Sequence, residues 1–232
     1  MKKIIEVENL YKAFGRKKVL TNISFSIEAG RIIGLLGENG VGKTTLLKVL
    51  ADLYKPDKGH IWIIEEESSI KTHKYISYMI HTEQLSDWMT IQQAIYYFKD
   101  LFPDFDTKKA FLLCDIFQLS PKDKVKRLSK GNQERVMLLL TISREAYLYI
   151  LDEPLEGLDI RMKKSMIEIL ISNIKEDASI LISTHMVREM EEIFDEVMVL
   201  HNNQLIAANA DDIREQKQQS IEEFYLEVTK NA

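Results

Sequence analysis

The sequence predicts an α/β fold with a mostly parallel sheet covered by helices, an N-terminal antiparallel β region and an inserted helical sub-domain. Short apolar segments alternate with helix-patterned segments near both ends of the chain, which is typical of a parallel sheet. Between them, residues 91–144 follow only a helical period. The chain is therefore expected to form one α/β unit that is interrupted by a group of helices.

The N-terminal elements follow from apolar spacing and turn residues. Residues 19–27 alternate apolar and polar side chains, as a half-buried strand does, and residues 31–36 form a short apolar run that ends at a glycine. Further strands are expected at residues 4–7 and 60–64, and a helix at residues 44–51. These segments predict strands on both sides of a first helix.

The later elements divide the chain into a core and an insertion. Helices are expected in the middle region, with a broad apolar face at residues 110–119. Afterwards we expect strands at 147–151, 179–183, 196–200 and 204–208, helices at 161–175 and 186–193, and a helical tail at 211–228. The sequence thus predicts one domain spanning 1–232, with an α/β core at 1–84 and 146–232 and a helical sub-domain at about 85–145.

Composition excludes several classes of protein. The 232 residues carry a net charge of -5, which argues against a global basic field for nucleic acid. The single cysteine, Cys114, cannot form an internal disulfide, so a reducing cytoplasm is expected. Glu6 and Glu8 interrupt the start before a signal peptide could form, and no stretch reaches the roughly 18–20 apolar residues that span a bilayer. We expect a chain that does not cross a membrane by itself.

A glycine-rich segment between a strand and a helix predicts a phosphate site. Residues 37–44 match the P-loop pattern G-x-x-x-x-G-K-[ST], in which backbone N–H groups surround phosphates at a helix N-terminus. Lys43 would bind the β- and γ-phosphates, and Thr44 would bind Mg²⁺. The predicted ATP-binding residues are Gly37, Glu38, Asn39, Gly40, Val41, Gly42, Lys43, Thr44 and Thr45. A chance match is the alternative, but the strand and helix context argues against it.

Two acidic residues end a second apolar strand. Asp152 and Glu153 follow residues 148–151, and an acid at the end of a strand beside a P-loop is where Mg²⁺ is held. Asp152 is thus the predicted metal ligand, and Glu153 the predicted catalytic base that polarises the attacking water. A solvated acidic turn is the alternative, which the P-loop makes less attractive.

A third motif, Leu128-Ser129-Lys130-Gly131-Asn132, resembles the signature motif L-S-G-G-Q of ABC (ATP-binding cassette) ATPases. The order of P-loop, signature, acidic strand, residues 157–159 (Gly-Leu-Asp) and residues 183–185 (Ser-Thr-His) resembles the complete cassette over nearly the whole chain. Each motif is weak alone, whereas five in this order are specific. The fold that this resemblance implies is the P-loop NTPase core.

The resemblance also implies residue roles. Ser129, Gly131 and Asn132 would meet the γ-phosphate of ATP held by a second subunit, so that two subunits enclose two ATP molecules. Asp159 would cross that interface, and His185 would be the switch histidine at the γ-phosphate. Phe14 matches the aromatic position that stacks on adenine. The alternatives are a core phenylalanine for Phe14 and a surface histidine for His185.

The sequence departs from the family pattern in two places. Lys130 and Asn132 replace a glycine and the glutamine of the signature, while the phosphate-facing Ser129 and Gly131 remain. The family also has a glutamine that touches Mg²⁺ after a strand, and alignment of residues 76–80 on that strand puts His81 in its place. Either His81 acts as a metal-site residue there or the loop is remodelled.

The resemblance implies the ATP-hydrolysing subunit of an ABC transporter, using ATP and Mg²⁺ and working as a homodimer or heterodimer. It would drive a separate membrane-spanning subunit at the cytoplasmic face of the cell membrane. Export of a peptide, antibiotic or lipid-like substrate is the expected direction because Leu-Ser-Lys-Gly resembles bacterial exporters. The alternative is a soluble ABC ATPase acting in iron–sulfur assembly or on DNA. No nucleic-acid partner is expected.

A docking site for the membrane subunit is expected in a groove between the core and the helical sub-domain. Its predicted lining is the segment after His81, with Trp88 and Met89 as a large apolar pair and Leu85, Asp87 and Ile91 beside them. The competing interpretation is that Trp88 packs beneath the helical sub-domain.

Overall fold

The computed structural model describes residues 2–230 and contains two sheets that share a layer of apolar side chains. The central sheet has the order β10-β9-β3-β8-β7-β6. Its strands are β3 (Ile32–Leu36), β6 (Ile76–Tyr78), β7 (Leu148–Asp152), β8 (Ser179–Thr184), β9 (Glu196–His201) and β10 (Gln204–Asn209). All neighbours are parallel except β9 and β10. The predicted α/β fold with a mostly parallel sheet is confirmed.

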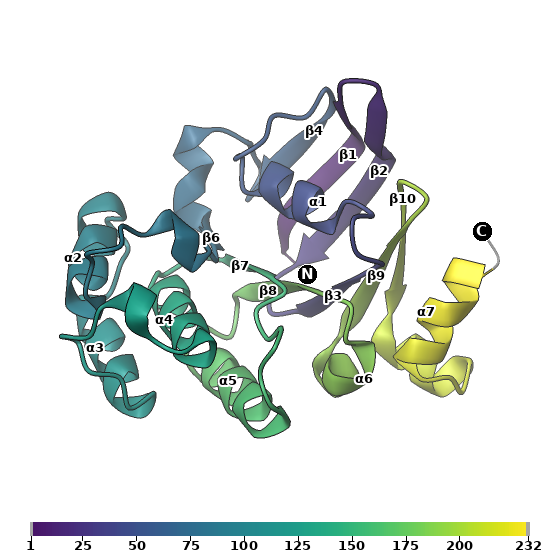
Figure 1. The fold of residues 1–232 in the computed structure, drawn as a ribbon. Coiled ribbons are helices and arrows are strands. Elements are labelled where there is room, and N and C mark those ends of the chain that lie inside the picture. The colour runs from purple at the N-terminus through teal and green to yellow at the C-terminus, as the bar shows by residue number, and fades with distance from the viewer. Residues whose placement is uncertain (1, 231–232) are drawn as a thin grey trace.

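The second sheet is antiparallel and has the order β2-β1-β4-β5. Its strands are β1 (Lys3–Phe14), β2 (Lys17–Glu28), β4 (Lys58–Ile63) and β5 (Glu66–Glu67). β1 is longer than the predicted strand at residues 4–7, because it pairs with β2 on one edge and β4 on the other, and this pairing carries its polar residues into the sheet. The helix α1 (Lys43–Leu50) lies between the two sheets (Figure 1).

Successive side chains of the central strands pack alternately into two separate hydrophobic cores. Leu148 and Ile150 of β7 join a cluster with α1 and the antiparallel sheet, whereas Tyr149 and Leu151 face the helices on the other side. Successive side chains of a strand point to opposite faces, so strands that are apolar on both faces must be covered on both. The carboxyl ends of β3 and β7, which carry the two phosphate-site motifs, are fixed by this double packing.

The remaining helices belong to the apolar core on the face of the central sheet opposite α1. They are α2 (Ile91–Leu101), α3 (Thr107–Ile116), α4 (Lys130–Ile142), α5 (Ile160–Ser172), α6 (Val187–Met190) and α7 (Ile221–Lys230). Short 3₁₀ turns are η1 (Ile70–Tyr75), η2 (Thr82–Gln84), η3 (Val125–Arg127) and η4 (Glu191–Ile193). Figure 1 shows α2 to α4 grouped at one end of the molecule, and α7 at the other.

The tail predicted to be helical at residues 211–228 is helical in two parts with a break between them. A π-helical turn, η5 (Asp212–Gln216), comes first, and α7 begins only at Ile221. Ser220 starts α7 because its hydroxyl accepts a hydrogen bond from Glu223 N while the Glu223 carboxylate accepts one from Ser220 N. This capping box was readable as Ser-x-x-Glu, but the amphipathic pattern across it concealed the break.

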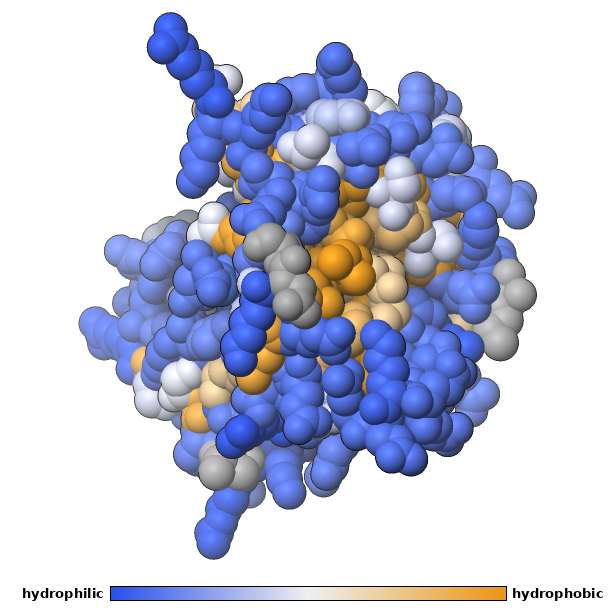
Figure 2. All heavy atoms as spheres, turned by 90° about the vertical axis from the view of Figure 1, so that its right-hand side faces the viewer, coloured by the Kyte–Doolittle hydropathy of each residue, from blue (hydrophilic) through white to orange (hydrophobic). Residues whose placement is uncertain are grey.

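The side of the molecule that carries β10 and α7 shows an apolar area ringed by hydrophilic side chains (Figure 2). Ile206 of β10 and Leu226 of α7 are exposed apolar side chains from these two elements. None of the sequence motifs belongs to β10 or α7. The apolar surface on β10 and α7 is therefore separate from the elements that carry the phosphate-site motifs.

Candidate functional site

The P-loop is a glycine turn between β3 and α1. Gly37, Gly40 and Gly42 have φ values of +158°, +79° and +121°, a region that side chains other than glycine rarely adopt. A Cβ at Gly37 would lie 2.7 Å from the carbonyl oxygen of Leu200, so space as well as conformation requires glycine there. The turn delivers the chain to the N-terminus of α1, where the first N–H groups lack intrahelical partners and attract anions.

Lys43 is a buried cation at the start of α1. Its Nζ donates hydrogen bonds to the carbonyl oxygens of Gly37 at 2.7 Å and Glu38 at 3.3 Å, and lies 3.2 Å from Oε1 of Glu153. Only 6% of the residue is exposed. The ammonium thus joins the P-loop to the end of β7, which is the expected meeting point of the two motifs.

The acidic residues after β7 belong to a hydrogen-bonded group. The Ser183 hydroxyl donates to Asp152 Oδ1 at 2.6 Å and accepts from Glu153 N at 3.0 Å. Glu153 Oε2 lies 3.1 Å from His185 Nδ1. Asp152, Glu153 and His185 are therefore brought together as predicted. The buried Ser183, which was not predicted to take part, holds the Asp152 carboxylate and the Glu153 backbone.

The cavity at this point fits a nucleotide with Mg²⁺. It measures about 290 Å³ and is lined by Phe14, Lys17, Val19, Glu38, Asn39, Gly40, Gly42, Lys43, Thr44, Thr45 and Glu153. Glu153 Oε1 is buried and makes no hydrogen bond, although Lys43 is near it. Glu153 thus places a buried carboxylate oxygen beside Lys43, among the phosphate-binding groups, which is where a general base would act on an attacking water.

Mg²⁺ would be held by few protein ligands. No cluster of three or more His, Cys, Asp and Glu side chains that could hold a metal ion occurs within residues 2–230. Magnesium is usually bound by one or two protein oxygens together with phosphates and water, so Thr44 and Asp152 form a sufficient donor set for a nucleotide-bound ion. The residues that line and adjoin the cavity therefore fit both a nucleotide and its Mg²⁺ ion.

Phe14, at the end of β1, lines the cavity and is 48% exposed. The alternative of a core phenylalanine is therefore wrong. Its ring contacts Tyr54 edge-on, with centroids 5.6 Å apart and an interplanar angle of 75°. Phe14 is thus an exposed aromatic side chain at the rim of the P-loop cavity.

The signature residues lie outside the cavity of their own chain. Ser129 is exposed and caps α4, accepting a hydrogen bond from Asn132 N at 3.4 Å. A Cβ at Gly131 would meet Met162 Sδ at 2.7 Å, so α4 approaches α5 closely there. Asp159 caps α5 by accepting from Met162 N at 3.0 Å and is also exposed. Within one chain these residues organise two helix N-termini.

Lys130, one of the two departures from the family signature, packs within its own chain. Its Nζ lies 3.0 Å from the position that a Cβ of Gly157 would occupy. Burial raises the pKa of Glu134, and the charge of Lys130 opposes that rise. The lysine therefore covers the turn between β7 and α5 and neighbours Glu134, one turn along α4.

His81 lies at the start of η2 and is exposed. Its N–H donates to Gln84 Oε1 at 3.0 Å, so the two candidates for the glutamine position are parts of one turn. Among the described residues that line the phosphate cavity, neither His81 nor Gln84 occurs. The structure places the loop near β7 through the pairing of Tyr78 with Ile150, and it leaves the His81 side chain open to solvent.

The predicted docking segment is only partly available to a partner. Trp88 is 58% exposed, so it does not pack beneath the helices. Met89 is 7% exposed and belongs to the core, as do Leu85 and Ile91. The prediction that these three apolar side chains line a groove is wrong, because they pack inward while Asp87 and Trp88 point outward.

A different apolar cavity, which the sequence motifs did not indicate, lies between the core and the helices. It measures about 180 Å³ and is lined by Ala51, Leu53, His73, Ile76, Ser77, Tyr78, Ile80, Gln84, Phe98, Phe102 and Arg144. Arg144 is buried at its base, where its guanidinium bonds both carboxylate oxygens of Asp104 at 3.1 Å and the carbonyl oxygen of Ile76 at 2.6 Å. These residues lie far apart in the sequence, so no local sequence pattern predicts the cavity.

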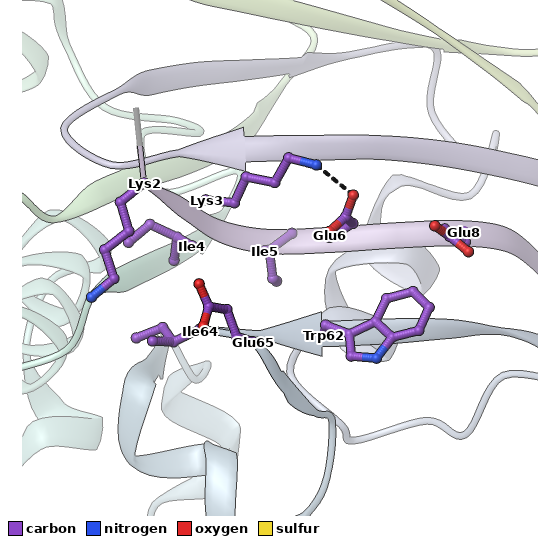
Figure 3. A pocket seen from close by; sticks show the side chains of 9 residues that line it. All are labelled: Lys2, Lys3, Ile4, Ile5, Glu6, Glu8, Trp62, Ile64 and Glu65. Carbon is purple, nitrogen blue, oxygen red and sulfur yellow. Dashed lines mark hydrogen bonds and ion pairs between the residues drawn. The ribbon is translucent and has the colours of Figure 1, made fainter.

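A larger cavity of about 520 Å³ lies over the antiparallel sheet and is lined by residues of β1, of β4 and of the turn after β4 (Figure 3). Its lining includes Trp62 and Glu65 from the β4 side and an ion pair between Lys3 and Glu6 on β1. None of the motif residues lines it. Size alone therefore does not identify the site in this molecule.

The glycine turn, the buried lysine and the two acids define a P-loop ATPase. The family sequence model described as "ABC transporter" matches residues 20–156, and the chain belongs to the ABC transporter family as an ATP-binding subunit whose ATP hydrolysis is coupled to transport. The chain is 31% identical to the "ABC transporter ATP-binding protein YtrB" of Bacillus subtilis (strain 168), over 94% of this chain and 75% of that protein.

Other relatives differ in the direction of transport that their names state. The "SkfA peptide export ATP-binding protein SkfE" of Bacillus subtilis (strain 168) is 32% identical over 88% of this chain and 87% of that protein. Further relatives are named for the import of ribose or galactose. The comparisons therefore establish a transporter ATPase without its direction, and they do not favour the alternative of an ABC ATPase outside transport.

Solved structures agree with this assignment. "Structure of ATP binding subunit of ABC transporter" superposes with a TM-score of 0.86 at 26% identity, over 97% of this chain and 98% of that one. Subunits of this family bind ATP, normally with Mg²⁺, pair with a membrane subunit and dimerise. None of the helices between residues 2 and 230 has the length and apolar character needed to span a bilayer.

Proposed function

We propose that ATP is hydrolysed in the cavity at the P-loop, with a distinct role for each polar side chain. Lys43 binds the β- and γ-phosphates, Thr44 and Asp152 hold Mg²⁺, and Glu153 polarises the attacking water. Bound Mg²⁺ supplies positive charge that offsets the charge of the phosphates. The observation that carries this proposal is the position of Glu153, 3.2 Å from Lys43 Nζ and 3.1 Å from His185 Nδ1.

The ion pair between Lys43 and Glu153 gives nucleotide binding a chemical consequence. Phosphate oxygens compete with Glu153 for the ammonium, because both are anions that a single lysine can satisfy. When Lys43 turns to the phosphates, Glu153 Oε1 becomes free to accept a proton from water. His185 holds the other oxygen of Glu153 and so orients the carboxylate, while its second ring nitrogen remains for the γ-phosphate.

The exposed signature supports a dimer in which each subunit completes the site of the other. Ser129, Gly131 and Asn132 stand at the N-terminus of α4, whose partial positive charge favours an anion. Asp159 stands at the N-terminus of α5 beside them. A second subunit, either the same chain or another cassette, would present its bound ATP to this surface.

We divide the chain into a core at 1–84 and 146–232 and a helical lobe at about 85–145, and propose that the membrane-spanning subunit docks between them. The apolar cavity above Arg144 lies at this junction, and Leu53 on its rim is exposed. Trp88 adds a second exposed apolar contact on the helical side. Docking here would hold the chain at the cytoplasmic face of the cell membrane.

Export of a peptide, antibiotic or lipid-like substrate is the direction that we propose. The signature Leu-Ser-Lys-Gly resembles that of exporters with a separate membrane subunit. The relative SkfE, which is named for peptide export, matches most of both chains. The membrane subunit selects the substrate, so the identity of that subunit decides the direction.

Co-purification tests the docking groove. The chain is co-expressed with a candidate membrane subunit, extracted in mild detergent and captured through a tag. Leu53→Glu and Trp88→Ala should abolish capture of the membrane subunit while melting temperature and ATP binding stay near wild type. Ile206→Glu is the matched control, since this apolar residue is exposed on β10. Capture that survives both groove substitutions would reject this docking site.

A further inference from the structure

The loop that follows α1 returns to the end of β1 and binds it. Asp57 N donates to the carbonyl oxygen of Tyr11 at 2.8 Å, and Ala13 N donates to Asp57 Oδ2 at 2.6 Å. Lys12 Nζ adds an ion pair with Asp57 Oδ1 at 3.1 Å. The backbone hydrogen bond from Ala13, followed by Lys12, keeps the pKa of Asp57 below its usual value. The side chain and backbone of Asp57 thus bind three consecutive residues of β1, which come just before Phe14.

Tyr54, in the same loop, contacts Phe14 directly. The two rings form an edge-to-face pair with centroids 5.6 Å apart. Tyr54 is itself fixed to the end of α1, since its N–H donates to the carbonyl oxygen of Lys48 at 3.1 Å and Lys48 Nζ lies 5.5 Å from its ring centroid. The phenylalanine therefore has a neighbour in the loop that directly follows the P-loop helix.

These contacts relate the two ends of the nucleotide cavity. The N-terminus of α1 forms the phosphate end, and the loop after its C-terminus holds the strand that carries Phe14. The base and the triphosphate of one nucleotide are joined covalently, so both can be bound well only at a fixed separation. An exposed ring without a neighbour would lose rotational freedom when a base stacked on it, which lowers affinity.

We propose that Tyr54 and Asp57 are positioning residues that hold Phe14 ready to stack on a purine base at the correct distance from the P-loop. The proposal rests on the proposed role of Phe14 in base binding. Tyr54 packs against the ring in an edge-to-face pair, and Lys12 Nζ lies 5.4 Å from the ring centroid. The ring is still 48% exposed, which leaves surface for the base. Asp57 fixes the backbone of β1 beneath it. Neither residue touches the nucleotide.

Calorimetric titration with two ligands separates positioning from folding. Mg–ATP contains a base, and Mg–tripolyphosphate contains only the phosphates. Phe14→Ala should weaken ATP binding by about 5- to 100-fold, the value of one aromatic stacking contact, and leave tripolyphosphate binding unchanged. Tyr54→Leu should weaken ATP binding by about 2- to 10-fold, the value of an edge-to-face aromatic pair, and Tyr54→Phe should restore it.

Asp57→Ala should resemble Tyr54→Leu, weakening ATP binding while tripolyphosphate binding persists. The double variant Phe14→Ala/Tyr54→Leu should bind ATP no more weakly than Phe14→Ala, because Tyr54 acts only through Phe14. Tripolyphosphate binding also confirms that each variant is folded at the P-loop.

The outcomes distinguish the positioning role from the role of Phe14. If Phe14→Ala binds ATP like wild type, base stacking on Phe14 is rejected, and the positioning proposal with it. If Phe14→Ala weakens binding while Tyr54→Leu and Asp57→Ala do not, only the positioning proposal is overturned. Additive losses in the double variant, or loss of tripolyphosphate binding in Tyr54→Leu, also overturn it, since they would place Tyr54 in direct contact or in the fold of the P-loop.

Discussion

The two ends of the catalytic machinery differ in how far one chain completes them. At the phosphate end, Lys43, Asp152 and Ser183 are buried, and their polar atoms bond one another or the P-loop backbone. At the other end, Ser129 and Asp159 are exposed, and their side chains cap helices of their own chain. A buried polar group must be satisfied internally, whereas an exposed cap is free to meet another molecule. This difference agrees with the proposed dimer, in which a second subunit would complete the site that one chain prepares.

The largest expected effect is at the phosphate end. Glu153→Gln should lower ATP turnover by roughly 10²- to 10⁴-fold, the usual contribution of a general base. ATP binding should persist, because the substitution removes the anion that competes with phosphate for Lys43. Steady-state ATPase assays and nucleotide titration measure the two effects, and size exclusion with ATP should show a trapped dimer.

Glu156→Gln is the control for that substitution, since Glu156 is exposed three residues further along. It should leave turnover near wild type. Turnover in Glu153→Gln that matches this control would remove Glu153 as the base.

Arg144 joins the loop between α2 and α3 to β6, and its loss should be the next largest effect. The buried guanidinium bonds Asp104 between α2 and α3 and the carbonyl oxygen of Ile76 at β6. Arg144→Ala leaves Asp104 without its partner, so we expect a loss of about 3–5 kcal/mol in the free energy of unfolding, the usual cost of breaking a buried pair. Urea denaturation measures it.

The exposed pair of Arg188 with Glu222 provides a matched comparison. Arg188→Ala should cost at most about 1 kcal/mol, because solvent screens an exposed ion pair. Equal losses in the two variants would mean that Arg144 does not hold the helices to the core.

This comparison also explains what could be predicted from the sequence. The P-loop and the acids after β7 were predicted because each motif is contiguous and stands at the end of a short apolar strand. Arg144 and Tyr54 were not, since their partners Asp104 and Phe14 lie 40 residues away along the chain in each case. Tertiary pairing sets these contacts, and a local pattern contains no record of it.

Apolar residue type also misled the prediction for the segment after His81. Trp88 and Met89 were interpreted as one exposed pair, yet Met89 packs into the core and Trp88 does not. Their opposite orientations follow from the turn that precedes α2, where Met89 N donates to the carbonyl oxygen of Ser86. Adjacent residues in a turn face different directions, and composition alone gives no direction.

A substitution at Ser129 tests the exposed end without disturbing the fold. Aspartate caps a helix as well as serine does and favours the positive N-terminus of α4, so Ser129→Asp should leave the melting temperature unchanged. Its negative charge would oppose the γ-phosphate of the second subunit, so we expect ATP-dependent dimerisation to weaken about 10-fold or more, the size of one close charge pair.

Ser129→Asn is the uncharged control, because asparagine also caps well. It should retain most of the dimer. Each Ser129 variant is combined with Glu153→Gln, and analytical ultracentrifugation with ATP measures the dimer fraction of both. If the aspartate and asparagine variants dimerise alike, the signature does not meet a phosphate.

The smallest expected effect is at His81, at the start of η2. It is exposed and sits in a loop whose turn is held by Gln84, so any contact with the Mg²⁺ or water of the site is partly screened by solvent. We expect His81→Ala to lower turnover by about 2- to 10-fold, the value of one ordinary hydrogen bond, and to leave ATP binding intact. His81→Gln restores the residue type of the family and should restore or raise the rate.

Gln84→Ala is the control for loop shape, because it removes the acceptor of the His81 backbone N–H and keeps the imidazole. A rate lowered by Gln84→Ala but not by His81→Ala would assign the effect to the conformation of the loop and would exclude His81 from the catalytic site.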